Sequence, residues 1–437
     1  MNNLFKNKKV VIMGLGLLGG GVGAVKFFVK KGAKVLVTDL RKTADLKESL
    51  NKIKRLPVKL VLGKHKKGDF KKCDLIIKNP AVPSNSPYLE IARKNNIPIK
   101  TDIDIFFDLC KVPIIGVTGT KGKSTVATLI YLLLKSKYRG TILAGNIGVS
   151  PLEILSKLTK KSKVVLELSS FELENLKKSP KIAVITNIFP DHLNRYKSFR
   201  DYIKAKEPIF KYQKKKDILI LNYNNPYTRK FALSAPSKVY FFKDSNISAA
   251  LLVAKIFKIS KKNSKKVLSN FKGIPNRQEL IAVKKGVKYI NDTTATTPQS
   301  TILAINTFKK RFSDSRIILI AGGVDKNLNY KDLAKEIQKK VDCLVLLPGT
   351  ASNKLKKELK KLTPLRVREF RRKHKANKPL RGLKIYCVNS MEKAVLIAAK
   401  MARKGDIALF SPGATSFNLF KNEFDRGKKF CQALKIL

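Results

Sequence analysis

Short apolar runs alternate along the chain with longer segments of mixed polarity. The strands that these runs predict lie within positions 10–13, 34–38, 73–77, 97–99, 114–117, 141–144, 164–168, 182–186, 281–290, 316–321, 343–347 and 407–410, some of which include charged residues. Buried strands that alternate with helices are typical of α/β domains with mostly parallel sheets. The chain has 437 residues, and domains average roughly 150 residues. We therefore expect three α/β domains, covering residues 1–101, 102–272 and 273–437.

The first apolar run leads directly into a glycine turn. Gly14, Gly16 and Gly19 follow it in the spacing G-x-G-x-x-G, and the second run ends at Asp39. A strand, such a turn, a helix and an acid after the next strand form the dinucleotide-binding pattern, in which the acid bonds a ribose hydroxyl. The pattern predicts a Rossmann-like N-terminal domain. It does not decide whether this domain holds NAD, a uridine nucleotide or no nucleotide.

A second glycine-rich turn separates an apolar run from an apolar helix. Residues 116–125 read G-V-T-G-T-K-G-K-S-T. Backbone N–H groups at a helix N-terminus bind phosphate, Lys123 can neutralise phosphate charge, and the hydroxyl of Ser124 or Thr125 can ligate Mg²⁺. Val117 stands where the common G-x-x-x-x-G-K-[ST] loop has its first glycine. The turn predicts a nucleoside triphosphate site of an unusual subtype in a P-loop-type central domain with a mostly parallel sheet.

Three further residues of the central domain are candidates for chemistry. Glu167 lies in an apolar strand, where a carboxylate is costly unless it is paired or coordinates a metal; a core lysine is the alternative partner. His192 follows an acid at the end of a strand, the edge at which open α/β sheets bind ligands, although a lone histidine is more often structural. Lys206 lies in a segment that we expect to be one helix, 199–211, and composition does not distinguish it from surface lysines.

The last third of the chain repeats the pattern of a strand followed by a glycine-rich loop. A hairpin at 281–290 leads into the hydroxyl-rich loop 291–298, and the next apolar runs end in the loops 322–326 and 411–414. This alternation predicts a second Rossmann-like domain at the C-terminus.

The formal net charge of +61 raises the question of a nucleic-acid partner. A nucleic-acid binder concentrates Lys and Arg on one face or tail, whereas lysines here occur in every segment and only 366–378 forms a dense patch. We therefore expect charged solvated faces that attract anionic substrates, and no nucleic acid.

No apolar run reaches the ~20 residues that span a bilayer. Five scattered cysteines lack zinc spacing, so we expect buried thiols in a cytoplasmic monomer.

These motifs resemble the Mur ligase family along essentially the whole chain. Residues 116–125 match its phosphate loop, G-x-T-G-T-x-G-K-[ST]-[ST]. Further matches are 166–171, 191–196, 322–326, 411–416, 420–422 and 426–427. The resemblance implies an ATP-dependent amide ligase that converts a carboxylate to an acyl phosphate. Its implied substrates are ATP, UDP-N-acetylmuramoyl-L-alanine and D-glutamate.

The resemblance also implies roles for individual residues. For ATP these are Gly119, Thr120, Lys121, Gly122, Lys123, Ser124, Thr125, Asn246, Arg277 and Asp292. For the uridine nucleotide they are Gly16, Leu17, Leu18, Asp39, Leu40, Arg41, Asn79 and Asn146. For the amino acid they are Thr296, Lys326, Ser416 and Phe417. The implied catalytic residues are Lys123, Glu167, His192 and Lys206, and the implied Mg²⁺ ligands are Ser124, Glu167, His192 and a carbamylated Lys206. The carbamate forms from a neutral amine, which requires neighbouring charges that disfavour the ammonium form.

Five positions differ from the family pattern. Thr294 replaces a lysine of the last domain, Asn79-Pro80-Ala81 replaces Ser-Pro-Gly, Asn276 replaces the histidine of a His-Arg pair, and Asn418 replaces an acid. The phosphate and metal ligands are retained, so the differences concern the amino acid. The alternatives are a related ligase with another amino acid or acceptor, and a basic nucleic-acid-binding NTPase that only the charge favours. A nicotinamide dehydrogenase gives no role to the second phosphate loop.

Overall fold

The computed structural model describes residues 4–17, 19–193, 195–243, 245–271, 273–373, 382–416 and 419–437, with the backbone alone for 363–373. Its contacts divide the chain into two compact units. The first comprises Met1–Ile188 and Arg200–Phe271, and the second comprises Phe189–Phe199 and Lys272–Leu437. In the described part of the chain, no helix has the length and apolar character needed to cross a membrane.

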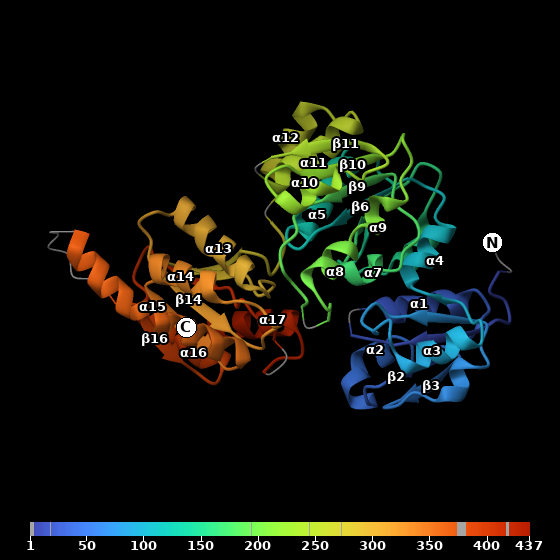
Figure 1. Cartoon of the computed structure of the whole chain (residues 1–437), viewed down its shortest axis with the longest axis horizontal. Coiled ribbons are helices and arrows are strands. Elements are labelled where there is room, and N and C mark those ends of the chain that lie inside the picture. The colour runs from blue at the N-terminus through green and yellow to red at the C-terminus, as the bar shows by residue number, and fades with distance from the viewer. Residues whose placement is uncertain are drawn as a thin grey trace. The chain divides into compact units, whose positions relative to one another are not determined.

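The first sheet has five parallel strands in the order β3-β2-β1-β4-β5 (Figure 1). Its strands are β1 (Lys9–Met13), β2 (Lys34–Asp39), β3 (Val58–Leu62), β4 (Leu75–Lys78) and β5 (Ile99–Lys100), and its helices are α1 (Gly20–Lys30), α2 (Lys47–Asn51) and α3 (Pro87–Lys94). The chain order reverses between β1 and β4, which makes the carboxyl end of β1 the expected ligand-binding edge. The glycine turn follows β1 at that edge.

The second sheet, also in the first unit, has six parallel strands in the order β11-β10-β9-β6-β8-β7. Its strands are β6 (Ile114–Thr118), β7 (Thr141–Gly145), β8 (Lys163–Glu167), β9 (Ile182–Ile185), β10 (Ile218–Asn222) and β11 (Lys238–Phe242). Its helices are α4 (Asp102–Leu109), α5 (Lys123–Lys135), α6 (Pro151–Ile154), α7 (Ser170–Leu173), α8 (Phe199–Lys204), α9 (Pro208–Lys211), α10 (Pro226–Phe231), α11 (Asn246–Ile256) and α12 (Lys261–Ser269). Ile115 and Val117 of β6 pack in one buried cluster with the apolar faces of α5 and α11. Strand β6 is central, so the phosphate loop that follows it is anchored in the core.

The third sheet, in the second unit, has the order β12-β13-β17-β14-β15-β16, with only the β12–β13 pair antiparallel. Its strands are β12 (Glu279–Lys284), β13 (Val287–Asn291), β14 (Ile317–Gly322), β15 (Cys343–Leu347), β16 (Lys384–Cys387) and β17 (Ile407–Phe410). Its helices are α13 (Pro298–Arg311), α14 (Lys331–Lys340), α15 (Thr350–Lys373), α16 (Met391–Met401) and α17 (Glu423–Ala433). Along β14, Ile317 and Leu319 pack with α13, α14 and α15, whereas Ile318 and Ile320 pack with α16 and α17. Helices therefore cover both faces of this sheet.

The predicted fold class is confirmed, and two details are wrong. The helix predicted over 199–211 is two short helices, α8 and α9, because Pro208 lacks the N–H group that a continuous helix needs. Lys206 lies in the turn between them. The five cysteines are free as expected, but only Cys343 is buried and Cys387 is exposed.

Gly21 in the first turn of α1 allows the helix to lie directly on the glycine turn. A Cβ at Gly21 would lie 2.3 Å from the Leu15 carbonyl oxygen and 2.8 Å from that of Gly14, whereas a Cβ at Gly68 would meet nothing within 4 Å. We expect Gly21→Ala to destabilise the N-terminal domain by about 1–3 kcal/mol, because the backbone atoms it strikes cannot move independently. Thermal unfolding followed by circular dichroism measures the effect, with Gly68→Ala as the control. A Gly21→Ala protein as stable as Gly68→Ala would contradict the close packing.

Candidate functional site

The carboxylate of Asp39 holds the glycine turn of the first sheet. Asp39 is buried at the end of β2, and its Oδ2 accepts hydrogen bonds from the N–H groups of Leu15 (2.9 Å) and Gly16 (3.2 Å). Its Oδ1 accepts from the Arg41 N–H, and the Arg41 guanidinium lies 3.9 Å away. Asn79, just after β4, packs on the same turn, 3.0 Å from where a Gly16 Cβ would stand. Four of the residues predicted to contact a uridine nucleotide thus lie together at one sheet edge, and Leu17 and Leu40 are exposed beside them.

Glycine is required at two positions of the phosphate loop. Gly119 has φ of 146°, and a Cβ there would lie 2.0 Å from the Thr186 hydroxyl oxygen. Gly122 has φ of 82° and packs against the Asn246 side chain at the start of α11. These conformations are open to glycine and strained for other residues. They bring Asn246, predicted to contact ATP, to the phosphate loop.

Asn187, which was not among the predicted site residues, also holds the backbone of the phosphate loop. Its carbonyl oxygen accepts from the Thr120 N–H and its Oδ1 from the Lys121 N–H, each at 2.8 Å. Its Nδ2 donates to the Lys121 carbonyl. Its position two residues after strand β9, which pairs with β6 in the sheet, is the sequence signal that could have identified it.

The carboxylate of Glu167 is buried at the end of β8. Its Oε1 accepts a hydrogen bond from Asn146 Nδ2 (3.1 Å), and the Asn146 N–H donates to the Glu167 carbonyl (2.9 Å). Its Oε2 is buried without a hydrogen-bond partner in the described structure. The core lysine considered as an alternative partner is not what holds Oε1. Burying a carboxylate oxygen without a hydrogen-bond donor is energetically unfavourable. Coordination of a divalent cation by this oxygen would satisfy it.

Lys206 and Lys123 approach the same backbone carbonyl. Lys206 is buried with 1% of its surface exposed, lies 4.8 Å from the centre of the Tyr202 ring and donates to the Gly119 carbonyl at 3.2 Å. Lys123 donates to the Gly119 and Thr120 carbonyls, each at 3.0 Å. Two cationic groups that share one acceptor repel each other, so this close approach is unusual for a pair of lysines. Lys206 is therefore not an ordinary surface lysine, which its sequence context could not show.

Two more buried carboxyl groups lie in the first unit. Glu172 forms a capping box with Ser169, whose N–H and hydroxyl both donate to Glu172 Oε2. Burial, reinforced by the charge of Asp102, raises the pKa of Glu172 to about 8. Burial also raises the pKa of Asp102 to about 6. Near neutral pH the Glu172 carboxyl is thus predominantly protonated.

His192 and Asp191 belong to the second unit, where Lys326 contacts Asp191. Lys326 Nζ lies 3.2 Å from Asp191 Oδ1 and 3.4 Å from the Thr296 hydroxyl. His192 has a left-handed backbone with φ of 55°, and its N–H donates to Asp191 Oδ1. A non-glycine residue in this conformation is a candidate functional position. Asp191 thus holds both the predicted metal-binding histidine and the predicted amino-acid-binding lysine.

Buried Arg426 connects the two loops that carry the other predicted residues of this unit. Its guanidinium donates to the Thr293 hydroxyl and carbonyl and to the Ala414 carbonyl, at 2.7–3.2 Å. Asp292 is buried and accepts from the Ser411 hydroxyl at 2.8 Å. Ser416 is buried in the second loop, and Arg277 is half-buried before β12. The structure therefore brings together Asp292, Thr296, Lys326 and Ser416 around the carboxyl ends of the adjacent strands β13, β17 and β14. The predicted residues Leu18 and Phe417 lie outside the described residues.

Three α/β sheets, a phosphate loop with two obligatory glycines and a buried, incompletely bonded carboxylate define a nucleotide-dependent α/β enzyme. Comparison with protein families resolves the class further. Residues 8–101 match the MurD-like N-terminal domain of Mur ligases, 117–283 the Mur ligase middle domain and 276–413 the Mur ligase glutamate ligase domain. The chain belongs to the Mur ligase family.

Relatives and solved structures agree with this assignment. The chain is 38% identical to the UDP-N-acetylmuramoylalanine–D-glutamate ligase of Roseiflexus sp. (strain RS-1) and 37% identical to that of Borreliella burgdorferi, with 97% of each chain covered. Its fold is similar to the crystal structure of UDP-N-acetylmuramate-alanine ligase MurC from Thermotoga maritima, with a TM-score of 0.62 at 17% identity, covering 98% of this chain and 100% of that one. It is also similar to a pseudomurein peptide ligase type C from Methanothermus fervidus, with a TM-score of 0.54 at 20% identity and the same coverage.

The raised pKa of Glu172 predicts a loss of stability as pH rises. Its pKa is 4.5 in ordinary surroundings and about 8 in the fold, so between these values the folded protein binds a proton that the unfolded chain has lost. The contribution of Glu172 to the free energy of unfolding is therefore fully present below pH 4.5. It falls by up to about 1.4 kcal/mol per pH unit through this window and is lowest above about pH 8. We expect metal-free Glu172→Gln to lose less stability than the unmodified protein between pH 6 and pH 8.5, because the amide does not ionise and its oxygen can still accept from Ser169. Thermal midpoints across pH measure this. Exposed Glu48→Gln is the control, and parallel pH curves for Glu172→Gln and the unmodified protein would refute the assignment.

Proposed function

We propose that the protein joins D-glutamate to UDP-N-acetylmuramoyl-L-alanine in the synthesis of peptidoglycan precursors, at the expense of ATP. The observation that carries the proposal is the convergence of Lys123 and Lys206 on the Gly119 carbonyl, beside the phosphate loop. Glu167 of the same sheet supports it, because its buried Oε2 has no hydrogen-bond donor among the described residues. Relatives named as D-glutamate ligases over nearly the full chain supply the substrate pair. The three domains proposed are residues 1–101 for the uridine nucleotide, 102–272 for ATP and 273–437 for the amino acid, acting as a cytoplasmic monomer on small molecules.

ATP supplies the phosphoryl group that turns the substrate carboxylate into an acyl phosphate, a far better electrophile. Lys123 neutralises charge on the transferring group, and the residues of the phosphate loop, Asn246, Arg277 and Asp292 orient the nucleotide. The amine of the amino acid then attacks the acyl carbon, and phosphate leaves with the electrons of the broken C–O bond. The chain's main contribution is to hold two substrates in register.

Mg²⁺ fits the residues present, and it would stabilise the negative charge of the phosphates. Hard oxygen donors suit it, and the Glu167 Oε2 atom is a buried oxygen without a donor. Ser124, Glu167, His192 and Lys206 as its carbamate would hold it. The described residues contain no group of three His, Cys, Asp or Glu side chains that could bind a metal. A carbamate on Lys206 would therefore supply an anionic oxygen that the unmodified side chains do not.

Thr296, Lys326 and Ser416 are proposed to hold the amino acid. Lys326 is a cation suited to a carboxylate, although Asp191 already neutralises part of its charge. Thr294, which stands where the family has a lysine, donates its hydroxyl to the Asn276 carbonyl and supplies no second cation. This observation keeps a ligase for a different amino acid as the second candidate function.

The proposed function is tested by phosphate release from ATP with UDP-N-acetylmuramoyl-L-alanine and a panel of amino acids. We expect D-glutamate to give at least about tenfold higher kcat/KM than L-glutamate, L-lysine or L-alanine, because a site built for one stereoisomer leaves polar groups unpaired with the other. Equal stimulation by L-glutamate would refute the D-glutamate assignment and leave the ligase class intact. Release that needs DNA or RNA would instead support the nucleic-acid-binding alternative.

Lys206 provides a test of the carbamate. We expect Lys206→Ala to lower kcat by about 10²-fold or more, because a buried charge-stabilising group is removed. A short carboxylic acid such as acetate should restore part of the activity by occupying the vacated space. Lys204→Ala, in the exposed end of α8, is the matched control and should retain normal activity. Unchanged turnover in Lys206→Ala, or the absence of any rescue by acids of different length, would count against the carbamate.

A further inference from the structure

A partly buried ion pair joins the first sheet to the second within the first unit. Lys78, the last residue of β4, has 3% of its side chain exposed and lies 3.6 Å from the carboxylate of Glu174, which is 16% exposed. Glu174 follows α7 in the central domain. The pair was not predicted, because the two residues lie far apart in the sequence and neither belongs to a motif.

On one side, the pair holds the turn that packs against the glycine turn. Lys78 Nζ also donates to the Val82 carbonyl at 2.9 Å, and the Val82 N–H donates to the Asn79 carbonyl. The side chains of Asn79 and Val82 pack against Gly14. A Cβ at Gly14 would lie 2.9 Å from the Asn79 Cβ and 3.3 Å from a Val82 methyl carbon. Glu174 Oε1 accepts from the Ser84 hydroxyl at 3.1 Å, which fixes the end of the same segment. The ion pair is therefore attached to the proposed uridine-nucleotide site.

On the other side, the pair holds the segment that follows the metal-site carboxylate. Glu167 ends β8, Ser169 caps α7, and the Glu174 N–H closes that single turn by donating to the Ser170 carbonyl at 2.9 Å. The Leu168 N–H donates to the Val117 carbonyl, which ties the start of the segment to β6. One short, hydrogen-bonded turn thus connects Glu174 with Glu167.

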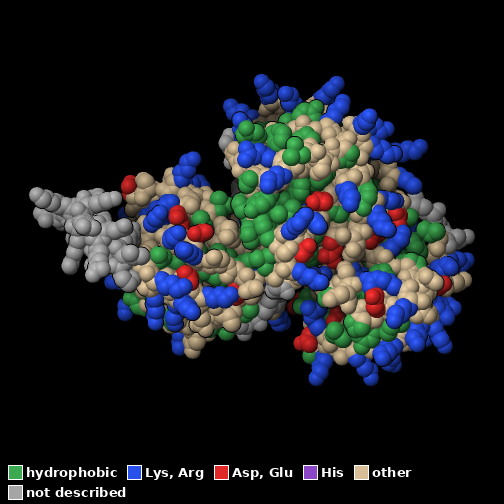
Figure 2. Space-filling model, in the orientation of Figure 1, with side chains coloured by type: hydrophobic (Ala, Val, Ile, Leu, Met, Phe, Trp, Pro, Cys, Tyr) green, Lys and Arg blue, Asp and Glu red, His purple; other side chains and the backbone are tan. Residues whose placement is uncertain are grey.

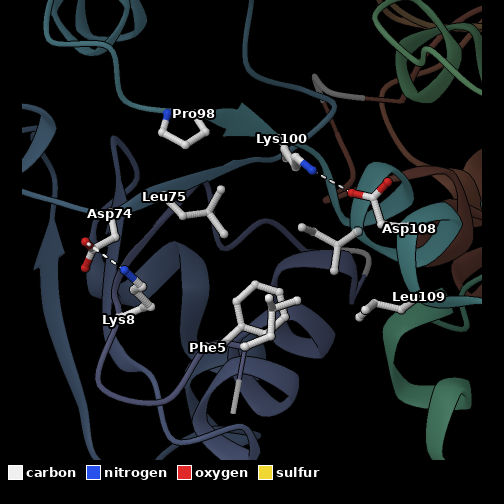
Figure 3. A pocket seen from close by; sticks show the side chains of 10 residues that line it. Phe5, Lys8, Asp74, Leu75, Pro98, Lys100, Asp108 and Leu109 are labelled. Carbon is white, nitrogen blue, oxygen red and sulfur yellow. Dashed lines mark hydrogen bonds and ion pairs between the residues drawn. The ribbon is translucent and has the colours of Figure 1, made fainter. Parts of the chain in front are cut away.

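The partial burial of this pair argues for a role in geometry more than in stability. Removing charges from water offsets much of their attraction, so such a pair adds little net stability, whereas it can fix the relative position of the elements that carry it. A second lysine–acid pair of the same unit shows the contrast. Lys100 and Asp108, at the rim of an apolar hollow of about 250 Å³ (Figure 3), lie 2.5 Å apart with 40% and 31% of their side chains exposed.

We propose that Lys78 and Glu174 are positioning residues that fix the distance between the nucleotide turn and the Glu167 edge. The inference rests on the proposed function, because that distance is the one that a substrate with a uridine nucleotide at one end and a reacting carboxylate at the other must span. UDP alone occupies only the first of these sites. The full substrate engages both, so its affinity depends on their separation.

The test compares the affinities of UDP and of UDP-N-acetylmuramoyl-L-alanine by isothermal titration calorimetry. Glu174→Gln is the leading variant, since it removes the charge while its amide oxygen can still accept from Ser84 and Lys78 keeps its bond to Val82. We expect the Kd of the full substrate to rise about tenfold and those of UDP and ADP to stay within about twofold. Lys100→Met is the matched control and should bind all three ligands normally. The double variant Lys78→Met/Glu174→Leu should recover the thermal midpoint of the unmodified protein without recovering full-substrate affinity.

Each outcome decides the proposal. Equal weakening of UDP and full substrate, or unchanged binding of both, would overturn it, and so would a double variant that restores affinity together with stability. If the unmodified protein binds ADP but neither uridine ligand, the proposed function itself fails. That result is visible before any variant is measured.

Discussion

The constraint on which the rest of the structure depends most is the burial of a carboxylate, that of Glu167, at the end of β8. Glu167 follows three buried apolar residues of β8, and among the described residues only its Oε1 has a hydrogen-bond donor, Asn146. A burial of this kind persists only where the rest of the fold holds it in place. Strand β8 is fixed between β6 and β7, and the capping box of Ser169 and Glu172 fixes the turn that follows it. The phosphate loop is anchored in the same way, at the end of the neighbouring strand β6.

All three sheets place their candidate chemistry at the carboxyl ends of adjacent strands. Parallel strands make this possible because their ends meet at one edge, so residues far apart in sequence become neighbours. In the second unit, the loops after β13, β14 and β17 bring Asp292, Lys326 and Ser416 together in this way, and Arg426 ties two of these loops from beneath. In the first unit, β1, β2 and β4 do the same for the glycine turn, Asp39 and Asn79.

The sequence predicted the features that depend on local patterns. Apolar runs, glycine spacing and the order of strands and helices were sufficient for the fold class, the phosphate loop and the glycine turn. What local patterns could not indicate depends on tertiary contacts. The family resemblance singled out Lys206, but its local sequence resembles that of every other lysine, and only burial places its amine beside that of Lys123. Asn187 was missed, because it is an ordinary loop residue until β9 and β6 pair. The single helix expected over 199–211 failed for a local reason, because Pro208 outweighs the apolar pattern.

The distribution of acids gives the extreme charge a physical meaning. The chain has 92 Lys and Arg but only 31 Asp and Glu. Lys and Arg side chains spread over the visible face of the molecule instead of gathering over one element (Figure 2). By contrast, several of the scarce acids are buried: Asp39, Asp102, Glu167, Glu172, Asp191, Asp292 and Asp406. Most of these lie at or after the carboxyl end of a strand, where they accept from backbone N–H groups or a hydroxyl, contact Lys326 or form a candidate metal position. A lysine-rich surface can vary in the number of its charges and still attract anionic substrates, whereas each of these carboxylates is fixed by specific partners. The buried acids, more than the abundant lysines, therefore distinguish the candidate sites from the rest of the chain.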